Sequence, residues 1–373
     1  MKTLKDFNFK GKNVLLRADL NSDVKNGRVL MSERIKESAR TIDYLKGKKA
    51  KVVVIAHQGT PGKDDFVSLK QHAQLLNRFT KIKFVNEVIG KKTENAIENL
   101  KNGESILLEN IRFEEDEFMP EKEGNRLLNL VELCDIYVND AFSVCHRKQT
   151  SIVLFPKYIK SCAGLLLEKE VNALKKIKIK DCLYVLGGAK PEDSIRLLKG
   201  NKVLACGLFG QCCLINKGKS LGEQDRYLRE QKAFVEISKD KLKNVETPVD
   251  FAVKVNNKRK ELKLDEFPNK YEIFDIGSKT IDKYVNEIKK AKAIYMKGPC
   301  GDANEKGFEK GTFSILKAIA KSKAYSVIGG GHLSDAIEAS GINKKKFGHI
   351  SLSGGALLNY VAGEKLPGLE ALG

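Results

Sequence analysis

Short apolar runs alternate with helical patterns along the whole chain, and this alternation limits the possible folds more than any other feature of the sequence. Short apolar runs are typical of buried strands, whereas apolar residues three and four apart predict amphipathic helices. The predicted strands lie at 14–16, 52–56, 106–108, 136–138, 183–186, 203–205, 251–253, 293–295 and 325–328, and the main predicted helices at 33–46, 69–79, 125–133 and 333–339. Strands that alternate with helices predict parallel sheets covered by helices, which is the α/β class.

The length of 373 residues is enough for two cores of ordinary size, so we expect two domains. Residues 162–177 carry apolar side chains at helical spacing, among them Leu167, Val171 and Leu174, and contain no glycine after Gly164. We interpret this stretch as one long helix that links the two domains.

The composition favours a soluble cytoplasmic protein. Hydrophobic residues make up 42% and charged residues 31% of the chain, and no apolar run approaches the ~20 residues that cross a bilayer. The first residues lack the apolar segment of a signal peptide. The eight cysteines lack the paired spacing of metal ligands, which favours reduced thiols and a cytoplasmic location.

The formal net charge of +19 favours anionic partners. Its lysines gather in runs at 175–180, 258–263 and 344–346, which we interpret mainly as solvated surfaces beside helices and loops. Aromatic residues are not interleaved with these runs, and no nucleic-acid motif is present. Small anions are therefore the better prediction, with nucleic acid as the weaker alternative.

A strand followed by glycines and a helix occurs twice in the second half. Residues 183–186 lead into Gly187, Gly188 and Lys190, and 325–328 lead into the glycines at 329–331. Free backbone N–H groups at such a helix start bind anions, and ligands of open parallel sheets lie beyond the carboxyl ends of the strands. Neither group has the spacing of a P-loop or a dinucleotide fingerprint. The alternative for the first is an ordinary turn with a solvated lysine.

Polar residues follow the strands of the first half. Arg17, Asp19 and Asn21 come after one strand, and His57, Gly59, Arg112, Asn139, Asp140 and Arg147 come after others, while Arg34 opens the first helix. Several arginines at the carboxyl end of one sheet suit an anion that carries both carboxylate and phosphate groups. Taken singly, each arginine is better explained by a surface ion pair, and only their shared position after strands favours a ligand site.

These segments resemble the phosphoglycerate kinase family. The matching blocks, in family order, are LLRADLN at 15–21, LLENIRF at 107–113, VNDAF at 138–142 with HR at 146–147, LGGAK at 186–190, PVD at 248–250, DIGSKT at 275–280, GPCG at 298–301, VIGGG at 327–331, SGGA at 353–356 and LPG at 366–368. The ordered set covers nearly the whole chain. In its short length, the chain is similar to archaeal-type members of the family.

The resemblance implies two Rossmann-like three-layer α/β domains with parallel sheets, joined by a long helix. Residues 1–161 would bind 3-phosphoglycerate, 162–177 would form the interdomain helix, 178–356 would bind ADP or ATP with Mg²⁺, and 357–373 would return to the first domain. The implied activity is reversible phosphoryl transfer between 1,3-bisphosphoglycerate and ADP, by a monomer that closes about its hinge and binds neither nucleic acid nor membrane.

The resemblance also implies the residues of the site. The triose site would use Asp19, Asn21, Arg34, His57, Gly59, Thr60, Arg112 and Arg147. The nucleotide site would use Lys190, Ser194, Asn304, Gly330, Gly331, His332 and Leu333. Arg34 and Lys190 would be catalytic, because they would place positive charge around the transferred group.

Several of these positions depart from the family pattern. Thr60 stands where a substrate-site arginine is usual, Ser194 replaces a second lysine, and Asn304 replaces a ribose-binding glutamate. His332 replaces the aspartate that helps to hold the metal, and Asp335, one turn along, is a weak substitute. Gln149, Ala303 and the closing block at 351–355 also differ. These departures leave a second hypothesis open, a non-catalytic sensor of a phosphometabolite or nucleotide on the same fold.

Overall fold

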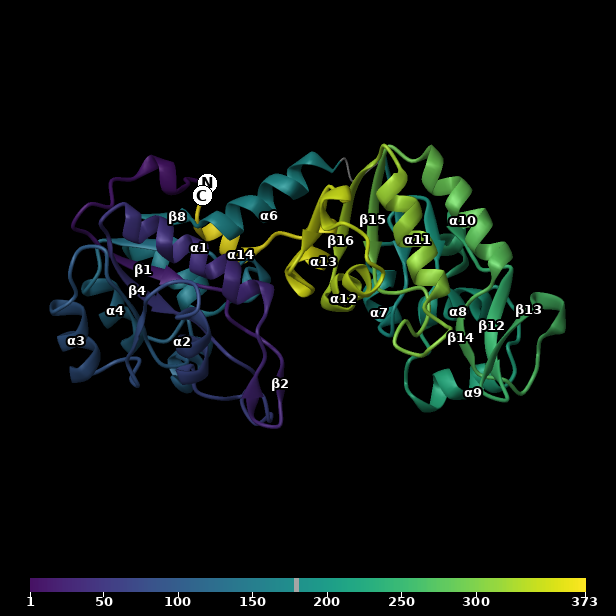
Figure 1. The fold of residues 1–373 in the computed structure, drawn as a ribbon, viewed down its shortest axis with the longest axis horizontal. Helices are drawn as coiled ribbons and strands as arrows, with labels where there is room; N and C mark the ends of the chain where they lie inside the picture. The colour runs from purple at the N-terminus through teal and green to yellow at the C-terminus, as the bar shows by residue number, and fades with distance from the viewer. Residues whose placement is uncertain (178–180) are drawn as a thin grey trace. The chain divides into compact units, whose positions relative to one another are not determined.

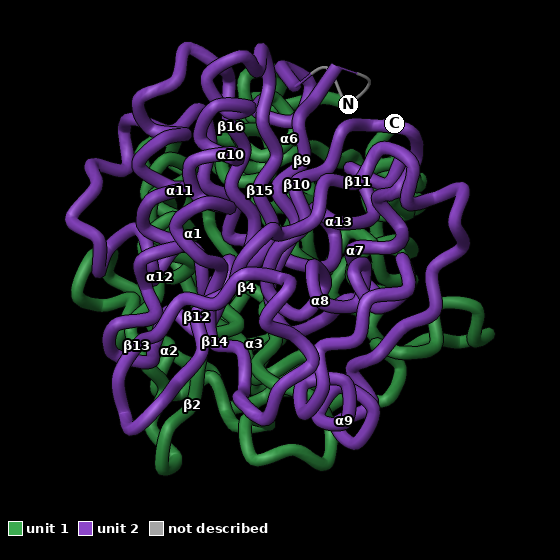
Figure 2. Tube along the Cα trace, turned by 90° about the vertical axis from the view of Figure 1, so that its right-hand side faces the viewer, with its two compact units in different colours: residues 1–172, 364–373 green, residues 173–363 purple. Residues whose placement is uncertain are grey.

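The structure is a computed structural model, and it describes residues 1–177 and 181–373. Part of the predicted lysine run at 175–180, and the predicted domain boundary at 178, lie outside the described residues. The chain divides into two compact units (Figure 2). Unit 1 comprises Met1–Asn172 and Glu364–Gly373, and unit 2 comprises Ala173–Gly363.

Unit 1 contains a six-stranded, fully parallel sheet in the order β5-β6-β4-β1-β7-β8. Figure 1 labels β1, β4 and β8 of this sheet. Its strands are β1 (Asn13–Arg17), β4 (Lys51–Ile55), β5 (Lys83–Phe84), β6 (Ser105–Leu107), β7 (Ile136–Asn139) and β8 (Ser161–Ala163). Its helices are α1 (Glu33–Gly47), α2 (Lys70–Leu76), α3 (Lys91–Glu98), α4 (Asn129–Glu132), α5 (Phe155–Tyr158) and α14 (Pro367–Ala371), and a small hairpin joins β2 (Val24–Lys25) to β3 (Arg28–Val29).

Alternate residues of the central strands point into two different cores. Val14 and Leu16 of β1 pack in a core with α1 and α2, whereas Leu15 packs in a second core with Ile97 of α3 and Leu130 of α4. Successive side chains of a strand point to opposite faces, so both faces of this sheet are covered. The predicted three-layer α/β fold is confirmed for this unit.

The helix α6 (Leu165–Lys176) begins three residues later than predicted, because Cys162 and Ala163 belong to β8. Asp140 fixes this start, since its Oδ1 accepts from the N–H groups of Leu166 at 2.7 Å and Leu167 at 3.1 Å. Burial raises the pKa of the Asp140 carboxyl to about 7. The predicted helix at 125–133 is likewise shorter and consists of a 3₁₀ turn followed by α4.

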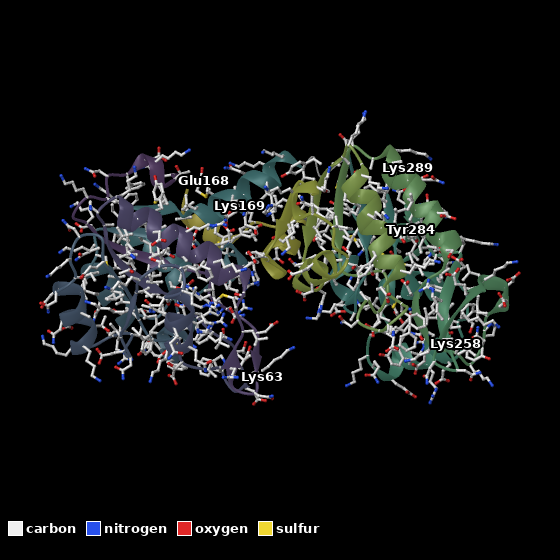
Figure 3. The ribbon with its side chains drawn as sticks, in the orientation of Figure 1. Lys63, Glu168, Lys169, Lys258, Tyr284 and Lys289 are labelled. Carbon is white, nitrogen blue, oxygen red and sulfur yellow. The ribbon has the colours of Figure 1, made fainter. Side chains whose placement is uncertain are left out.

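The helix α6 contributes residues to both units, because unit 1 includes its part up to Asn172 and unit 2 begins at Ala173. Lys169, labelled on α6 in Figure 3, lies 3.5 Å from Glu37 of α1. This ion pair joins the first turns of α6 to unit 1.

Unit 2 contains a second fully parallel sheet, in the order β11-β10-β9-β15-β16-β17. Its strands are β9 (Cys182–Leu186), β10 (Val203–Ala205), β11 (Val245–Glu246), β15 (Ala293–Lys297), β16 (Tyr325–Gly329) and β17 (His349–Ser351). Its helices are α7 (Pro191–Ile195), α8 (Gly207–Asn216), α9 (Glu223–Glu230), α10 (Ser278–Lys290), α11 (Lys310–Lys321), α12 (Gly331–Ala339) and α13 (Gly355–Val361).

Three helices, α10, α11 and α12, share one core with Leu183 and Val185 of β9. Tyr284 of α10, labelled in Figure 3, is fully buried, and its hydroxyl lies 2.7 Å from the carbonyl oxygen of Ala205. This hydrogen bond satisfies the phenol inside an apolar core and ties α10 to β10.

The predicted strand at 251–253 belongs to a separate antiparallel sheet rather than to the parallel one. This sheet pairs β12 (Asp250–Val255) with β13 (Lys258–Lys263) and β14 (Ile273–Ile276). Asn256 and Asn257 have φ of +48° and +59°, which suits the two-residue turn of a hairpin. The lysine run at 258–263 is therefore a mostly exposed strand and not a helix or loop surface.

The last residues of the chain pack in unit 1, where α14 contacts the helical turn at Thr150–Leu154. The N–H of Gly368 donates to the carbonyl oxygen of Cys145 at 2.9 Å. Residues 357–363 belong to unit 2 instead, because the buried side chains of α13 pack there. No helix in the described part of the chain is long and apolar enough to span a membrane.

We expect Gly368→Ala to loosen α14 from unit 1. A Cβ at this position would lie 2.7 Å from Cγ2 of Ile152 and 3.0 Å from Cα of Cys145, and overpacking of this kind costs about 1–3 kcal/mol. Hydrogen exchange should show faster exchange of the α14 amides. The matched control is Gly47→Ala, where a Cβ meets no heavy atom of the described chain within 4 Å. Unchanged protection of α14 in the Gly368 variant would contradict this packing.

Candidate active site

The carboxyl edge of the unit 1 sheet gathers the polar residues that follow β1 and β4. Arg34 donates from Nη1 to Oδ1 of Asp19 at 3.3 Å and to the carbonyl oxygen of Asn21 at 3.2 Å. The side-chain oxygen of Asn21 accepts from the N–H of Gly59 at 2.8 Å. Four residues predicted for the triose site are therefore joined by direct hydrogen bonds.

Arg112 follows β6 and is buried at the same edge. Its Nη1 donates to the carbonyl oxygen of Gly59 at 2.5 Å, and its Nη2 lies 3.4 Å from Oε1 of Gln149. Its Nε is buried and has no hydrogen-bond partner among the described residues. Burial, with smaller contributions from Arg147 and Arg17, lowers the pKa of Arg112 to about 10. This guanidinium has both charge and a donor to offer an anion.

His57 is also buried, and its Nδ1 lies 3.1 Å from Nη2 of Arg17. A guanidinium only donates hydrogen bonds, so Nδ1 of His57 must accept and the proton of the neutral ring is on Nε2. Burial and then Arg17 and Arg112 hold the pKa of His57 well below its usual value. The ring is therefore a neutral donor through Nε2–H.

The excess of positive charge is the main electrostatic property of this edge. Arg17, Arg34, Arg112 and Arg147 all act on His57, and Arg17 lowers the pKa of both Arg112 and Arg147. Like charges that lower one another's pKa are stabilised when an anion binds between them. Three carboxylates act on these arginines: Asp19 on Arg34, Glu117 on Arg17 and Arg112, and Asp65 on Arg112.

Thr60 and Gln149 occupy the positions that depart from the family pattern in this unit. The N–H of Thr60 donates to Oδ1 of Asp65 at 3.2 Å, and its side chain adds no charge. Gln149 is buried and accepts from Arg112. The edge therefore has its four arginines, but at position 60 it has a neutral threonine where the family pattern has a further arginine.

In unit 2 the first glycine turn is closed rather than open. The N–H of Gly187 donates to the carbonyl oxygen of Lys297, and that of Gly188 to the carbonyl oxygen of Pro299, both at 2.8 Å. These two N–H groups are therefore not available to an anion. The prediction concerned the N–H groups at the start of the helix, and α7 begins further along, at Pro191. Lys190 is exposed at the start of α7.

The second glycine turn differs. Gly330 has φ of +107° and precedes α12, and a Cβ at Gly330 or Gly331 would meet no heavy atom of the described chain within 4 Å. The first N–H groups of a helix have no acceptor within the helix. This turn therefore offers open space beside backbone donors. His332 and Asp335 are exposed, whereas the side chain of Leu333 is fully buried.

The other predicted nucleotide residues lie in different surroundings. Ser194 is fully buried, and its hydroxyl has no hydrogen-bond partner within the described part of the chain. Asn304 is exposed, and its N–H donates to Oδ1 of Asp302 at 3.1 Å. Among residues 1–177 and 181–373, no group of three or more His, Cys, Asp or Glu side chains is arranged to hold a metal ion.

Sequence reasoning missed Lys297, the last residue of β15. Its ammonium lies 3.2 Å from Oδ2 of Asp193, and its side chain is only 17% exposed. The available signal was the pattern used for the first half, a polar residue directly after an apolar run.

Two parallel-sheet α/β units, one with an arginine-rich sheet edge and the other with glycine turns at its sheet edge, define the class of two-domain α/β proteins. The chain belongs to the phosphoglycerate kinase family, since the family model for phosphoglycerate kinase matches residues 4–364.

Relatives and solved structures agree with this family. The phosphoglycerate kinases of Methanothermus fervidus and Methanopyrus kandleri are 38% and 39% identical to the chain, over 99% of its length and 96% and 97% of theirs. The crystal structure of phosphoglycerate kinase from Pyrococcus horikoshii OT3 has a TM-score of 0.90 at 36% identity and covers all of this chain and 98% of its own. The structure of the Coxiella burnetii phosphoglycerate kinase has a TM-score of 0.83 at 30% identity, with the same coverage.

We expect nitrogen-15 NMR to find His57 neutral, with its proton on Nε2, at about pH 6, where an ordinary histidine is largely protonated. The physical reason is burial together with the neighbouring arginines. A short histidine-containing peptide at the same pH serves as the reference for an ordinary imidazole. An imidazolium at position 57 at this pH, or a proton on Nδ1, would contradict the hydrogen bond from Arg17.

Proposed function

We propose that this chain transfers a phosphoryl group reversibly between 1,3-bisphosphoglycerate and ADP, forming 3-phosphoglycerate and ATP, in glycolysis and gluconeogenesis. Membership of the phosphoglycerate kinase family supports this activity. The observation that carries the proposal is the arginine-rich edge of unit 1, where Arg112 keeps a buried donor without a partner among the described residues.

We assign 3-phosphoglycerate to this edge. Arg34, Arg112 and Arg147 suit its carboxylate and phosphate, because a planar guanidinium binds either group through two donors. His57 would donate from Nε2 to a substrate oxygen. Asp19, Asn21 and Gly59 would hold Arg34 and Arg112 in place, and Thr60 would line the site without charge.

We assign the nucleotide to the sheet edge of unit 2. Gly330, Gly331 and Leu333 would contact its phosphates through backbone N–H groups, and the exposed Lys190 would reach the transferred group. The side chains of His332 and Asn304 are exposed, so they could contact the nucleotide directly. Ser194 is buried and could contact it only after a local rearrangement.

Mg²⁺ would arrive with the nucleotide. The donor set fits a metal that is held mainly by phosphate oxygens, with the exposed carboxylate of Asp335 as the candidate protein ligand. The ion would neutralise charge on the phosphates. The residues of the chain then have to align the two substrates and exclude water.

Phosphoryl transfer to a carboxylate needs alignment and positive charge rather than a base, because the accepting oxygen is already ionised at neutral pH. Arg34 would stabilise the charge from the triose side and Lys190 from the nucleotide side. We propose that closure about α6 brings the two substrates together and excludes water. The protein would act as a cytoplasmic monomer on small molecules.

A coupled assay with 3-phosphoglycerate, ATP and Mg²⁺ tests this function. We expect Arg34→Ala and Lys190→Ala each to lower kcat by about 100-fold or more, as for the loss of one electrostatic donor to a transition state. The matched control is Arg40→Ala, whose arginine lies on the same helix as Arg34 with a side chain that is 68% exposed.

Wild-type turnover in either purified variant would remove that residue from the catalytic set. An inactive wild-type chain that still binds 3-phosphoglycerate and ATP would contradict the kinase and support the sensor hypothesis, which the departures at Ser194 and His332 motivate.

A further inference from the structure

We propose that Lys297 is a second cation of the nucleotide site, which contacts phosphate oxygens that ADP and ATP share and stabilises the group in transfer. This inference rests on the proposed function. Ser194 stands where the family pattern has a second lysine, and Lys297 would supply the missing positive charge from a strand. The ammonium keeps its protons throughout and acts only by hydrogen bonds and charge.

Lys297 lies at the carboxyl end of a central strand of the unit 2 sheet. It ends β15 in register with Leu186 of β9 on one side and Gly329 of β16 on the other. Those two strands are the ones that run into the two glycine turns. The residue therefore lies between both turns on the central strand of the edge.

The strand order of the sheet also distinguishes this position. In the sheet, β10 and β11 lie on one side of β9, and β15, β16 and β17, which come later in the chain, lie on its other side. The order therefore reverses between β9 and β15. Ligands of open parallel sheets bind outside the carboxyl ends of the strands at such a reversal, and Lys297 is the only charged side chain that ends either of these two strands in the described structure.

The backbone around Lys297 is fixed by close packing. Its carbonyl oxygen accepts from the N–H of Gly187 at 2.8 Å. The next residue, Gly298, has φ of +74°, and a Cβ there would collide with the carbonyl group of Gly187. The turn at Gly187 and the turn at Gly298 are packed against each other, so the backbone of Lys297 has a fixed position. A catalytic cation needs such a fixed position to align with its substrate.

The charge on Lys297 has one described partner, Asp193 of α7, at 3.2 Å. An ammonium has three donors, so this single ion pair leaves capacity for phosphate oxygens. The competing explanation is a purely structural ion pair that fastens α7 to β15. A structural pair would not need to be placed at the reversal point between the glycine turns.

Ser194 supports the assignment because it directly follows Asp193. It is fully buried and carries no charge, so α7 itself has no cation at this turn. Lys297 reaches the same turn of α7 from the neighbouring strand through Asp193. Beside Lys190 at the start of α7, a second positive charge near this turn therefore comes from the sheet.

The test compares Lys297→Met and Lys297→Gln with Lys292→Met. Lys292 is exposed and directly precedes the same strand at its opposite end. We expect both Lys297 variants to lower kcat on the order of 100-fold and to weaken ADP binding measured by calorimetry, with binding of 3-phosphoglycerate unchanged. Lys292→Met should match the wild type, and Lys297→Arg should recover part of the activity. Thermal unfolding of every variant reports whether the fold is intact.

Asp193→Asn separates the two explanations, because it breaks the ion pair but keeps the lysine. We expect its kcat to stay close to that of the wild type. A loss as large as in the Lys297 variants would overturn the proposal and leave a structural pair, as would wild-type ADP binding and turnover in Lys297→Gln. If the wild-type chain has no kinase activity, the proposed function fails, and ADP binding still decides whether Lys297 is a phosphate contact.

Discussion

Parallel strand pairing is the constraint on which the rest of this structure depends. Parallel strands bring all their carboxyl ends to one edge, so residues far apart in the sequence meet there without any local motif. Arg17 of β1 lies in register with Asn139 of β7, although 121 residues separate them in the chain. The same pairing places the ends of β9, β15 and β16 side by side in unit 2.

The edge of unit 1 carries more positive charge than its own carboxylates balance. Burial and repulsion from neighbouring arginines both destabilise the charged form of Arg112, and the same surroundings keep His57 neutral. Such an arrangement is stable only because packing and hydrogen bonds hold each guanidinium, as Ser151 and Ala18 do for Arg17. An anion bound at this edge would relieve the repulsion between the guanidinium groups.

The sequence predicted the α/β class and most of the strands because alternation of apolar runs is a local signal. It placed the start of α6 too early, since nothing local shows that Cys162 and Ala163 pair with β7 or that Asp140 caps the helix from 26 residues away. It placed 251–253 without its antiparallel partners for the same reason. Nothing local shows that the N–H of Gly187 donates to the carbonyl oxygen of Lys297, the last residue of β15, over 100 residues later.

The site residues, like the fold, were predicted where the signal is local and missed where it depends on distant parts of the chain. Residue types directly after strands were enough to collect Asp19, Asn21 and Arg112, whose hydrogen-bonded arrangement within one unit only the structure reveals. Lys297 had the same local pattern and was missed, because its importance comes from its neighbours in the sheet and not from its neighbours in the chain. Roles at the nucleotide edge, and the closure that would join the two substrates, stay predictions.

A crystal structure of the chain with 3-phosphoglycerate is the measurement that tests the central claim most directly. The account predicts the ligand at the carboxyl edge of the unit 1 sheet, with an oxygen within hydrogen-bond distance of Nε of Arg112 and another of Nε2 of His57. A ligand bound elsewhere, or one that leaves Nε of Arg112 without a partner, would contradict it.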